Sequence, residues 1–114
     1  MTIISYKSYI YFISWEILIS EEYENWFNQL PQKHKIAIAT DLEVLCDFGP
    51  MLGRPYVDQI KGSKFKNLKE LRTKVSGHVY RSLFAFNPDR QAIILTGGNK
   101  KGKNQEKFYK HLIV

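Results

Sequence analysis

Apolar residues recur at helical spacing in the first half of the chain and at strand spacing after about residue 66. Residues 21–30 and 32–48 are each predicted to form an amphipathic helix, because their apolar positions lie three or four residues apart. Ser20 has the side chain of an N-cap for the first helix, and Pro31 separates the two helices. The buried stripe of the second helix is predicted to consist of Ile36, Ala39, Leu42, Leu45 and Cys46.

The alternating pattern of the second half predicts three strands joined by tight turns. Residues 67–74, 79–87 and 91–96 form these strands, with turns at Ser76-Gly77 and at residues 88–90. A short strand at 15–19 precedes the helices, residues 51–66 form a loop, the segment 97–99 ends the third long strand, and a last helix begins near Asn104. The order β-α-α-β-β-β-α predicts an α+β domain in which a helical hairpin packs on one side of a small, mostly antiparallel sheet.

The first 14 residues lie outside this pattern. They are apolar and aromatic, with Lys7 as the only charged residue, but Glu16 interrupts the apolar run and no small-residue cleavage site follows. The stretch is also short for a membrane span. Residues 1–14 are interpreted as an N-terminal extension: an extra strand, a poorly ordered tail or a start codon assigned too early, with the last two favoured. Residues 15–114 form one predicted domain.

Composition excludes several classes of protein. A chain that is 44% hydrophobic and 25% charged has the material for a core and is unlike a disordered chain. Cys46 is the only cysteine, which excludes a disulfide scaffold, and three scattered histidines (His34, His78 and His111) do not form a zinc ligand set. Phosphate-binding glycine loops and nucleophile elbows are missing. We expect no cofactor, no metal, no membrane partner and a cytoplasmic location, which the single thiol fits.

Charge is distributed unevenly along the chain. Residues 1–60 carry four basic against eight acidic side chains, a net charge of −4, whereas residues 61–114 carry thirteen against three, a net charge of +10. A basic, solvated surface without a special partner is the simpler interpretation. The steepness of the division favours a surface of the second half that faces a polyanion.

Two arginines are predicted to meet within that basic half. In a hairpin around Ser76-Gly77, Arg72 and Arg81 come close together on neighbouring strands, and two cations there repel unless an anion lies between them. A phosphodiester satisfies this geometry, because arginine offers a bidentate fork for phosphate oxygens. The alternative is structural: Arg72 pairs with Glu70 or with a carboxylate of a helix.

Such a cluster is able to cleave RNA without a metal. The 2′-hydroxyl attacks the adjacent phosphorus, cations stabilise the developing charge, and the reaction needs a base and an acid. Arginine is a poor base because it stays protonated, so Lys, Tyr or His must serve, with Tyr109 and His111 as candidates. The competing interpretation is a basic surface that only binds an acidic partner.

Several sequence blocks occur in the order and spacing of one known group of proteins. Those blocks are Asp47-Phe48-Gly49-Pro50, Lys69-Glu70-Leu71-Arg72, Tyr80-Arg81, Gly97-Gly98-x-Lys100 and Phe108-Tyr109. From about residue 15 to residue 114 the chain resembles the phage-derived Gp49-like, HigB-type branch of the RelE/ParE toxin superfamily. That resemblance implies the compact RelE fold and a toxin of a type II toxin–antitoxin pair. It also implies a cognate helix-turn-helix antitoxin as partner, and cleavage of mRNA on the ribosome.

The resemblance also assigns roles to individual residues. Arg72 corresponds to the arginine of the Glu-Leu-Arg block, and Arg81 corresponds to the arginine of the Tyr-Arg block, which contacts the phosphate and the transition state. Tyr109 resembles the late aromatic residue that stacks on a base. A basic residue of the loop after the last strand is Lys100, Lys101 or Lys103, with Lys103 taken as the catalytic one. RelE carries further lysines where this chain has Leu68 and Glu70. A catalytic lysine is therefore either absent from this strand or supplied by Lys69, Lys66 or Lys61. Together with Lys74, Lys100 and Lys101, these three lysines are the predicted RNA contacts.

Three functions follow. The first is a metal-independent, ribosome-dependent mRNA endonuclease that inhibits translation. The second is an inactive or non-cleaving module whose basic face only binds an acidic antitoxin segment. The third is a ParE-like inhibitor of gyrase, which predicts DNA damage with mRNA left intact.

Overall fold

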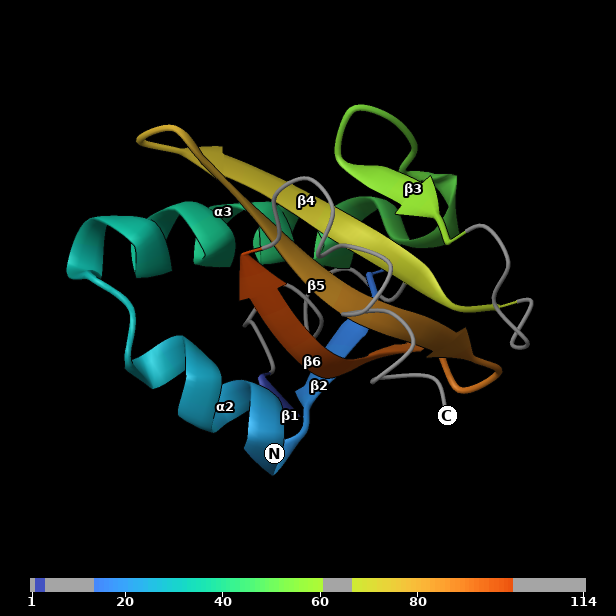
Figure 1. The fold of residues 1–114 in the computed structure, drawn as a ribbon. Coiled ribbons are helices and arrows are strands. Elements are labelled where there is room, and N and C mark those ends of the chain that lie inside the picture. Colours follow the sequence, from blue (N-terminus) through green and yellow to red (C-terminus); the bar gives the residue numbers. More distant parts are fainter. Residues whose placement is uncertain (1, 4–13, 61–66, 100–114) are drawn as a thin grey trace.

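The computed structural model describes residues 2–3, 14–60 and 67–99, and it contains two helices and a sheet within these ranges (Figure 1). In chain order its elements are β1 (Thr2–Ile3), β2 (Glu16–Ile19), α2 (Glu21–Asn28), α3 (Gln32–Phe48), the 3-10 turn η1 (Gly49–Met51), β3 (Val57–Gln59), β4 (Lys69–Val75), β5 (His78–Asn87) and β6 (Gln91–Asn99). The α+β prediction holds, while the predicted last helix near Asn104 lies outside the described residues.

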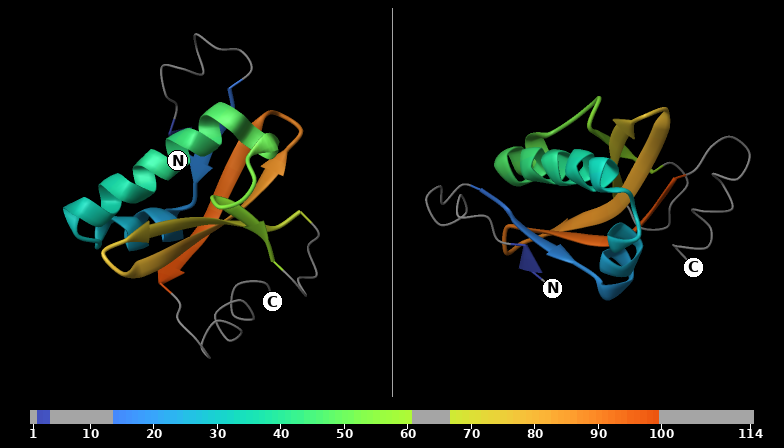
Figure 2. Two further views of the ribbon diagram at one scale, coloured as in Figure 1. Left: turned by 90° about the horizontal axis from the view of Figure 1, so that it is seen from above. Right: turned by 90° about the vertical axis from the view of Figure 1, so that its left-hand side faces the viewer.

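The strands form one sheet in the order β1-β2-β6-β5-β4-β3. Strands β3 to β6 pair antiparallel, whereas β2 pairs parallel with β6, with Ile17 opposite Ala92 and Ile19 opposite Ile94. The strong twist of the sheet and the course of α3 along it are visible in two further views (Figure 2). Strand β2, which precedes the helices, and strand β6, the last strand described, therefore lie side by side within the sheet.

A single hydrophobic core lies between the helices and the sheet. Tyr23 of α2 and Ile38, Leu42 and Leu45 of α3 pack with Leu71 and Phe84 and with the apolar residues of β2 and β6. The predicted stripe of α3 is only partly right, because Ile36 is 56% exposed and Ala39 is also exposed. The buried positions are Ile38, Leu42, Leu45 and Cys46, a set with the spacing of one helix face.

Local contacts explain where α2 begins and where α3 ends. Ser20 is the N-cap of α2: its hydroxyl accepts a hydrogen bond from the Tyr23 N–H at 3.0 Å, as its sequence position predicts. Gly49 follows α3 with a φ of +57°, and a Cβ at this position would collide with the Trp15 indole. The glycine is needed both for the backbone conformation and for the close approach of Trp15.

Three local predictions differ from the structure. The segment predicted as a loop at 51–66 contains the short strand β3, which pairs with β4. The strand predicted to stop at 96 continues through Gly97, Gly98 and Asn99. Thr2–Ile3 pairs antiparallel with β2, so these two residues form an extra strand, an interpretation that was less favoured than a poorly ordered tail or a start codon assigned too early.

Candidate functional site

Arg72 and Arg81 lie directly opposite each other on β4 and β5, as the hairpin count predicts. The N–H of Arg72 donates to the carbonyl of Tyr56 at 2.7 Å, on the side of β4 that faces away from β5. Arg72 and Arg81 are therefore a non-hydrogen-bonded pair of the β4–β5 ladder, the kind in which Cα atoms lie about 4.5 Å apart and side chains lie closest. The sequence thus placed the two guanidinium groups on the same patch of the sheet.

The anion that two neighbouring cations require is supplied by the chain itself. Glu70 Oε2 lies 3.4 Å from Arg81 Nε and 3.7 Å from Arg72 Nε. The Glu70 and Arg81 side chains are 8% and 10% exposed, whereas that of Arg72 is 34% exposed. The structural alternative for Arg72, pairing with Glu70, is therefore present in the structure. We call these three residues the arginine–glutamate cluster; they carry a formal net charge of +1.

The two described lysines of the predicted set lie on opposite faces of the sheet. Side chains alternate along β4, so Lys74 shares a face with Arg72, and it is exposed. Lys69 shares the other face with the buried Leu71, and its amine lies 5.6 Å from the centroid of the Phe86 ring. Lys69 is thus not brought to the arginine–glutamate cluster. The other predicted residues, Lys61, Lys66, Lys100, Lys101, Lys103 and Tyr109, lie outside the described residues, as does His111.

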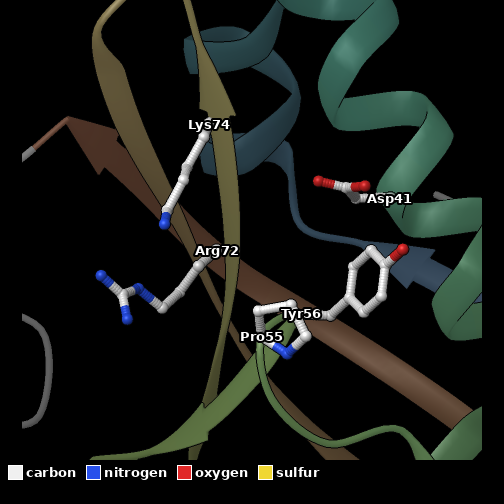
Figure 3. Close-up of a pocket in the computed structure, with 5 residues that line it drawn as sticks. All are labelled: Asp41, Pro55, Tyr56, Arg72 and Lys74. Atoms are coloured by element: carbon white, nitrogen blue, oxygen red, sulfur yellow. The ribbon is translucent and has the colours of Figure 1, made fainter.

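A shallow hollow of about 230 Å³ borders the cluster where β3 leaves the edge of β4. It is lined by Asp41, Pro55, Tyr56, Arg72 and Lys74. The carboxylate of Asp41 and the ring of Tyr56 lie on one side of β4, and the charged ends of Arg72 and Lys74 extend on the other (Figure 3). Arg72, the more exposed arginine of the pair, therefore contributes to the lining of this hollow.

Two carboxylates near the hollow titrate differently. Burial raises the pKa of Asp41, and the Thr73 hydroxyl beside it offsets part of that effect. At Asp58, partial desolvation acts to raise the pKa, but a hydrogen bond from the Gln59 N–H and the Arg54 guanidinium, with a smaller influence of the Arg72 charge, lower it overall. Arg54 donates two hydrogen bonds to this carboxylate, at 3.1 and 3.2 Å. Neither carboxylate lies between the two arginines of the cluster.

Sequence reasoning missed a second group of polar rings at the end of the β4–β5 hairpin. His34 Nδ1 lies 2.7 Å from the hydroxyl of Tyr80, and the rings of His34 and His78 are 5.2 Å apart. His78 stacks on Tyr80, and its Nδ1 contacts the side-chain amide of Asn99. The two histidines are 44 positions apart in the sequence, and the packing of α3 against the β4–β5 hairpin brings them together.

Across residues 14–60 and 67–99, no group of three or more His, Cys, Asp and Glu side chains is arranged to hold a metal ion. Neither of the helices in these ranges is long and apolar enough to cross a membrane.

Comparison with known proteins identifies the family. The family model described as "Phage derived protein Gp49-like (DUF891)" matches residues 25–114. The chain belongs to this family. It is 41% identical over 93 residues to "Putative toxin HigB3" of Mycobacterium tuberculosis, covering 82% of this chain and 79% of that relative. With "Putative toxin HigB2" of the same organism it shares 45% identity over 84 residues, covering 73% of this chain but only 42% of HigB2.

Solved structures confirm the fold. The archaeal RelE–RelB complex from Pyrococcus horikoshii superposes with a TM-score of 0.57 at 18% identity, covering 75% of this chain and 94% of the other. The RelB–RelE antitoxin–toxin complex from Methanococcus jannaschii gives 0.56 at 16% identity, with coverages of 82% and 96%. The Gp49-like family member therefore has a RelE-like fold, and its resemblance to HigB-type proteins of toxin–antitoxin systems is confirmed.

Proposed function

We propose that this Gp49-like protein is the toxin of a type II toxin–antitoxin pair and cleaves mRNA on the ribosome without a metal. The observation that carries the proposal is the pair Arg72–Arg81, which lies on one face of the sheet with the Arg72 side chain partly exposed. Arginine binds phosphate oxygens through a planar fork, which makes such a pair suited to a scissile phosphodiester. The +10 net charge of residues 61–114 supports a polyanionic substrate.

The chemistry would use the 2′-hydroxyl of the RNA as nucleophile. It attacks the adjacent phosphorus, the 5′-oxygen leaves, and a cyclic phosphate remains on the upstream fragment. Arg81 and Arg72 would stabilise the charge that builds on the phosphoryl oxygens. Neither serves as base, since both stay protonated, so the proton transfers fall to residues beyond β6, with Lys103, Tyr109 and His111 as candidates.

Two kinds of partner follow from this proposal. A helix-turn-helix antitoxin would neutralise the toxin; the RelE structures from both archaea were solved with RelB. The ribosome and its mRNA would bind through the basic half, with Lys61, Lys66, Lys74, Lys100 and Lys101 contacting the RNA backbone. The proposed site of action is the cytoplasm.

The test is primer-extension mapping of cellular mRNA after induction of the wild type, of Arg81→Lys and of Arg54→Lys. Arg81→Lys keeps the charge but loses the fork, whereas Arg54 is 76% exposed, pairs with Asp58 and serves as the matched control. We expect new 5′ ends inside translated reading frames for the wild type and for Arg54→Lys. For Arg81→Lys we expect these ends to fall by about 10²–10³-fold, with antitoxin binding retained.

Two other outcomes contradict the nuclease. Growth arrest with intact mRNA and induced DNA damage favours the gyrase inhibitor. Normal growth, intact mRNA and tight antitoxin binding favour the non-cleaving module, an alternative supported by the buried Glu70, which already neutralises one of the two arginine charges.

A further inference from the structure

Glu70 is an unusual residue for its position. It lies on β4 in an otherwise basic stretch, it is buried, and it faces two arginines rather than one. A buried carboxylate is retained only when cations or hydrogen bonds compensate for the lost hydration. We infer that Glu70 is a positioning residue that holds Arg72 and Arg81 side by side in the geometry that a phosphodiester requires. This inference rests on the proposed function and adds a residue to it.

The geometry indicates that Glu70 positions the two arginines and does not occupy the place where a phosphate would bind. Both contacts of Glu70 Oε2 are made to the Nε side of the guanidinium groups, at 3.4 and 3.7 Å. The Nη atoms of Arg72 are at the far end of that side chain, and the guanidinium points away from β4 beside the hollow (Figure 3). Glu70 thus lies against the inner edge of the pair, and the Arg72 side chain remains partly exposed.

Charge complementarity points the same way. The cluster carries a net charge of +1, which matches the single negative charge of a phosphodiester. Without Glu70 the pair would carry +2 and would bind any phosphate strongly, but mutual repulsion would drive the two side chains apart. Tight binding of the phosphate does not accelerate the reaction if the ground state and the transition state are bound equally strongly. Arginines held in a geometry that fits the transition state do accelerate it.

A second carboxylate, that of Asp58, makes it possible to separate the effect of direct contact with the arginines from the effect of negative charge alone. Asp58 lies directly opposite Glu70 on β3, and its carboxylate contacts Arg54 at 3.1 Å. Its negative charge acts on Arg72 only through space. If the net charge near the arginines were all that mattered, neutralising either carboxylate would have a similar effect. If Glu70 positions the arginines by contact, only its own replacement changes the reaction.

The experiment compares Glu70→Gln, Glu70→Asp and Asp58→Asn in purified toxin. Cleavage is measured on mRNA-programmed ribosomes, and binding is measured on a short single-stranded RNA with 2′-O-methyl groups at every position, which lacks the attacking hydroxyl. For Glu70→Gln we expect kcat to fall at least tenfold, affinity for the methylated RNA to stay or rise, and its salt dependence to steepen. Glu70→Asp should be intermediate, and Asp58→Asn should cleave like the wild type.

Three outcomes overturn the inference: unchanged kcat in Glu70→Gln, an equal loss of kcat in Asp58→Asn, or a parallel loss of affinity, kcat and melting temperature that marks a folding role. If the wild type binds RNA but does not cut it, the proposed function fails and a double-mutant cycle decides the inference. Coupling of tenfold or more between Glu70→Gln and Arg81→Lys in RNA affinity then supports positioning, and additivity overturns it. Absence of both cleavage on programmed ribosomes and RNA binding in the wild type overturns both proposals.

Discussion

The buried hydroxyl of Tyr23 is expected to make the stability of this fold depend on alkaline pH. Tyr23 is 1% exposed and its hydroxyl lies 2.8 Å from that of Ser82, which is equally buried. Burial raises the pKa of Tyr23 to about 12, despite the opposing effect of the Ser82 hydrogen bond. The unfolded chain has a tyrosine pKa of 10.0. Ionisation of this side chain therefore favours the unfolded state.

The sign and size of the effect follow from linkage. The folded pKa is above the unfolded one, so the contribution is complete below pH 10 and is lost as pH rises through 12. One pKa unit corresponds to about 1.4 kcal/mol, so the loss is about 1.4 kcal/mol by pH 11 and approaches about 3 kcal/mol above pH 12. Tyr23→Phe removes the titration, at a cost near neutral pH of about 1 kcal/mol for the lost hydrogen bond.

The measurement is urea unfolding of the wild type and Tyr23→Phe at several pH values between about 8 and 11. The difference in unfolding free energy between the two proteins isolates Tyr23, because the other titrating groups are common to both. We expect the difference in unfolding free energy, wild type minus Tyr23→Phe, to fall by about 1.4 kcal/mol across this range. A gap that stays constant would refute the argument and mean that the hydroxyl reaches water when it ionises.

Two matched pairs of substitutions test the packing. Gly97→Ala would place a Cβ 2.5 Å from Trp26 Cζ3 and is expected to cost about 1–3 kcal/mol in unfolding free energy; Gly53→Ala, with no atom within 4 Å of the added Cβ, is expected to stay within about 0.5 kcal/mol of the wild type. Ile38→Ala should cost about 2–5 kcal/mol because Ile38 is fully buried, whereas Ile36→Ala should change little. Urea denaturation measures the unfolding free energy of all four variants. Equal losses of stability in the two members of either pair would contradict the packing described.

Local signals were sufficient for most elements. The helical spacing around Tyr23 predicts α2, and the N-cap Ser20 forms the predicted contact. Counting residues from the turn at Ser76-Gly77 is enough to place Arg72 opposite Arg81, because the side chains of a hairpin keep a fixed register. The acidic partner of this pair was one of the alternatives left open by the sequence, since a pattern of charges does not show which anion is nearest.

The failures come from long-range packing. Residues 36–39 are apolar throughout, so the pattern alone fits more than one helix face, and the position of the sheet selects Ile38 over Ile36. Glycine at 97 suggests the end of a strand, yet β6 continues there because the missing side chain makes room for the Trp26 ring. His34 and His78 meet through tertiary contacts that no local window contains.

The parallel pairing of β2 with β6 has a consequence for the synthesis of the protein. Ile17 and Ile19 find their partners at Ala92 and Ile94, so the neighbouring strand is translated about 75 residues later. Until then Tyr23 and the buried stripe of α3 lack much of the surface that covers them. Contacts of such sequence separation form late, after the costly closure of a long loop. The sheet is therefore completed only after residues 91–99 have been synthesised and β6 is available to pair with β2.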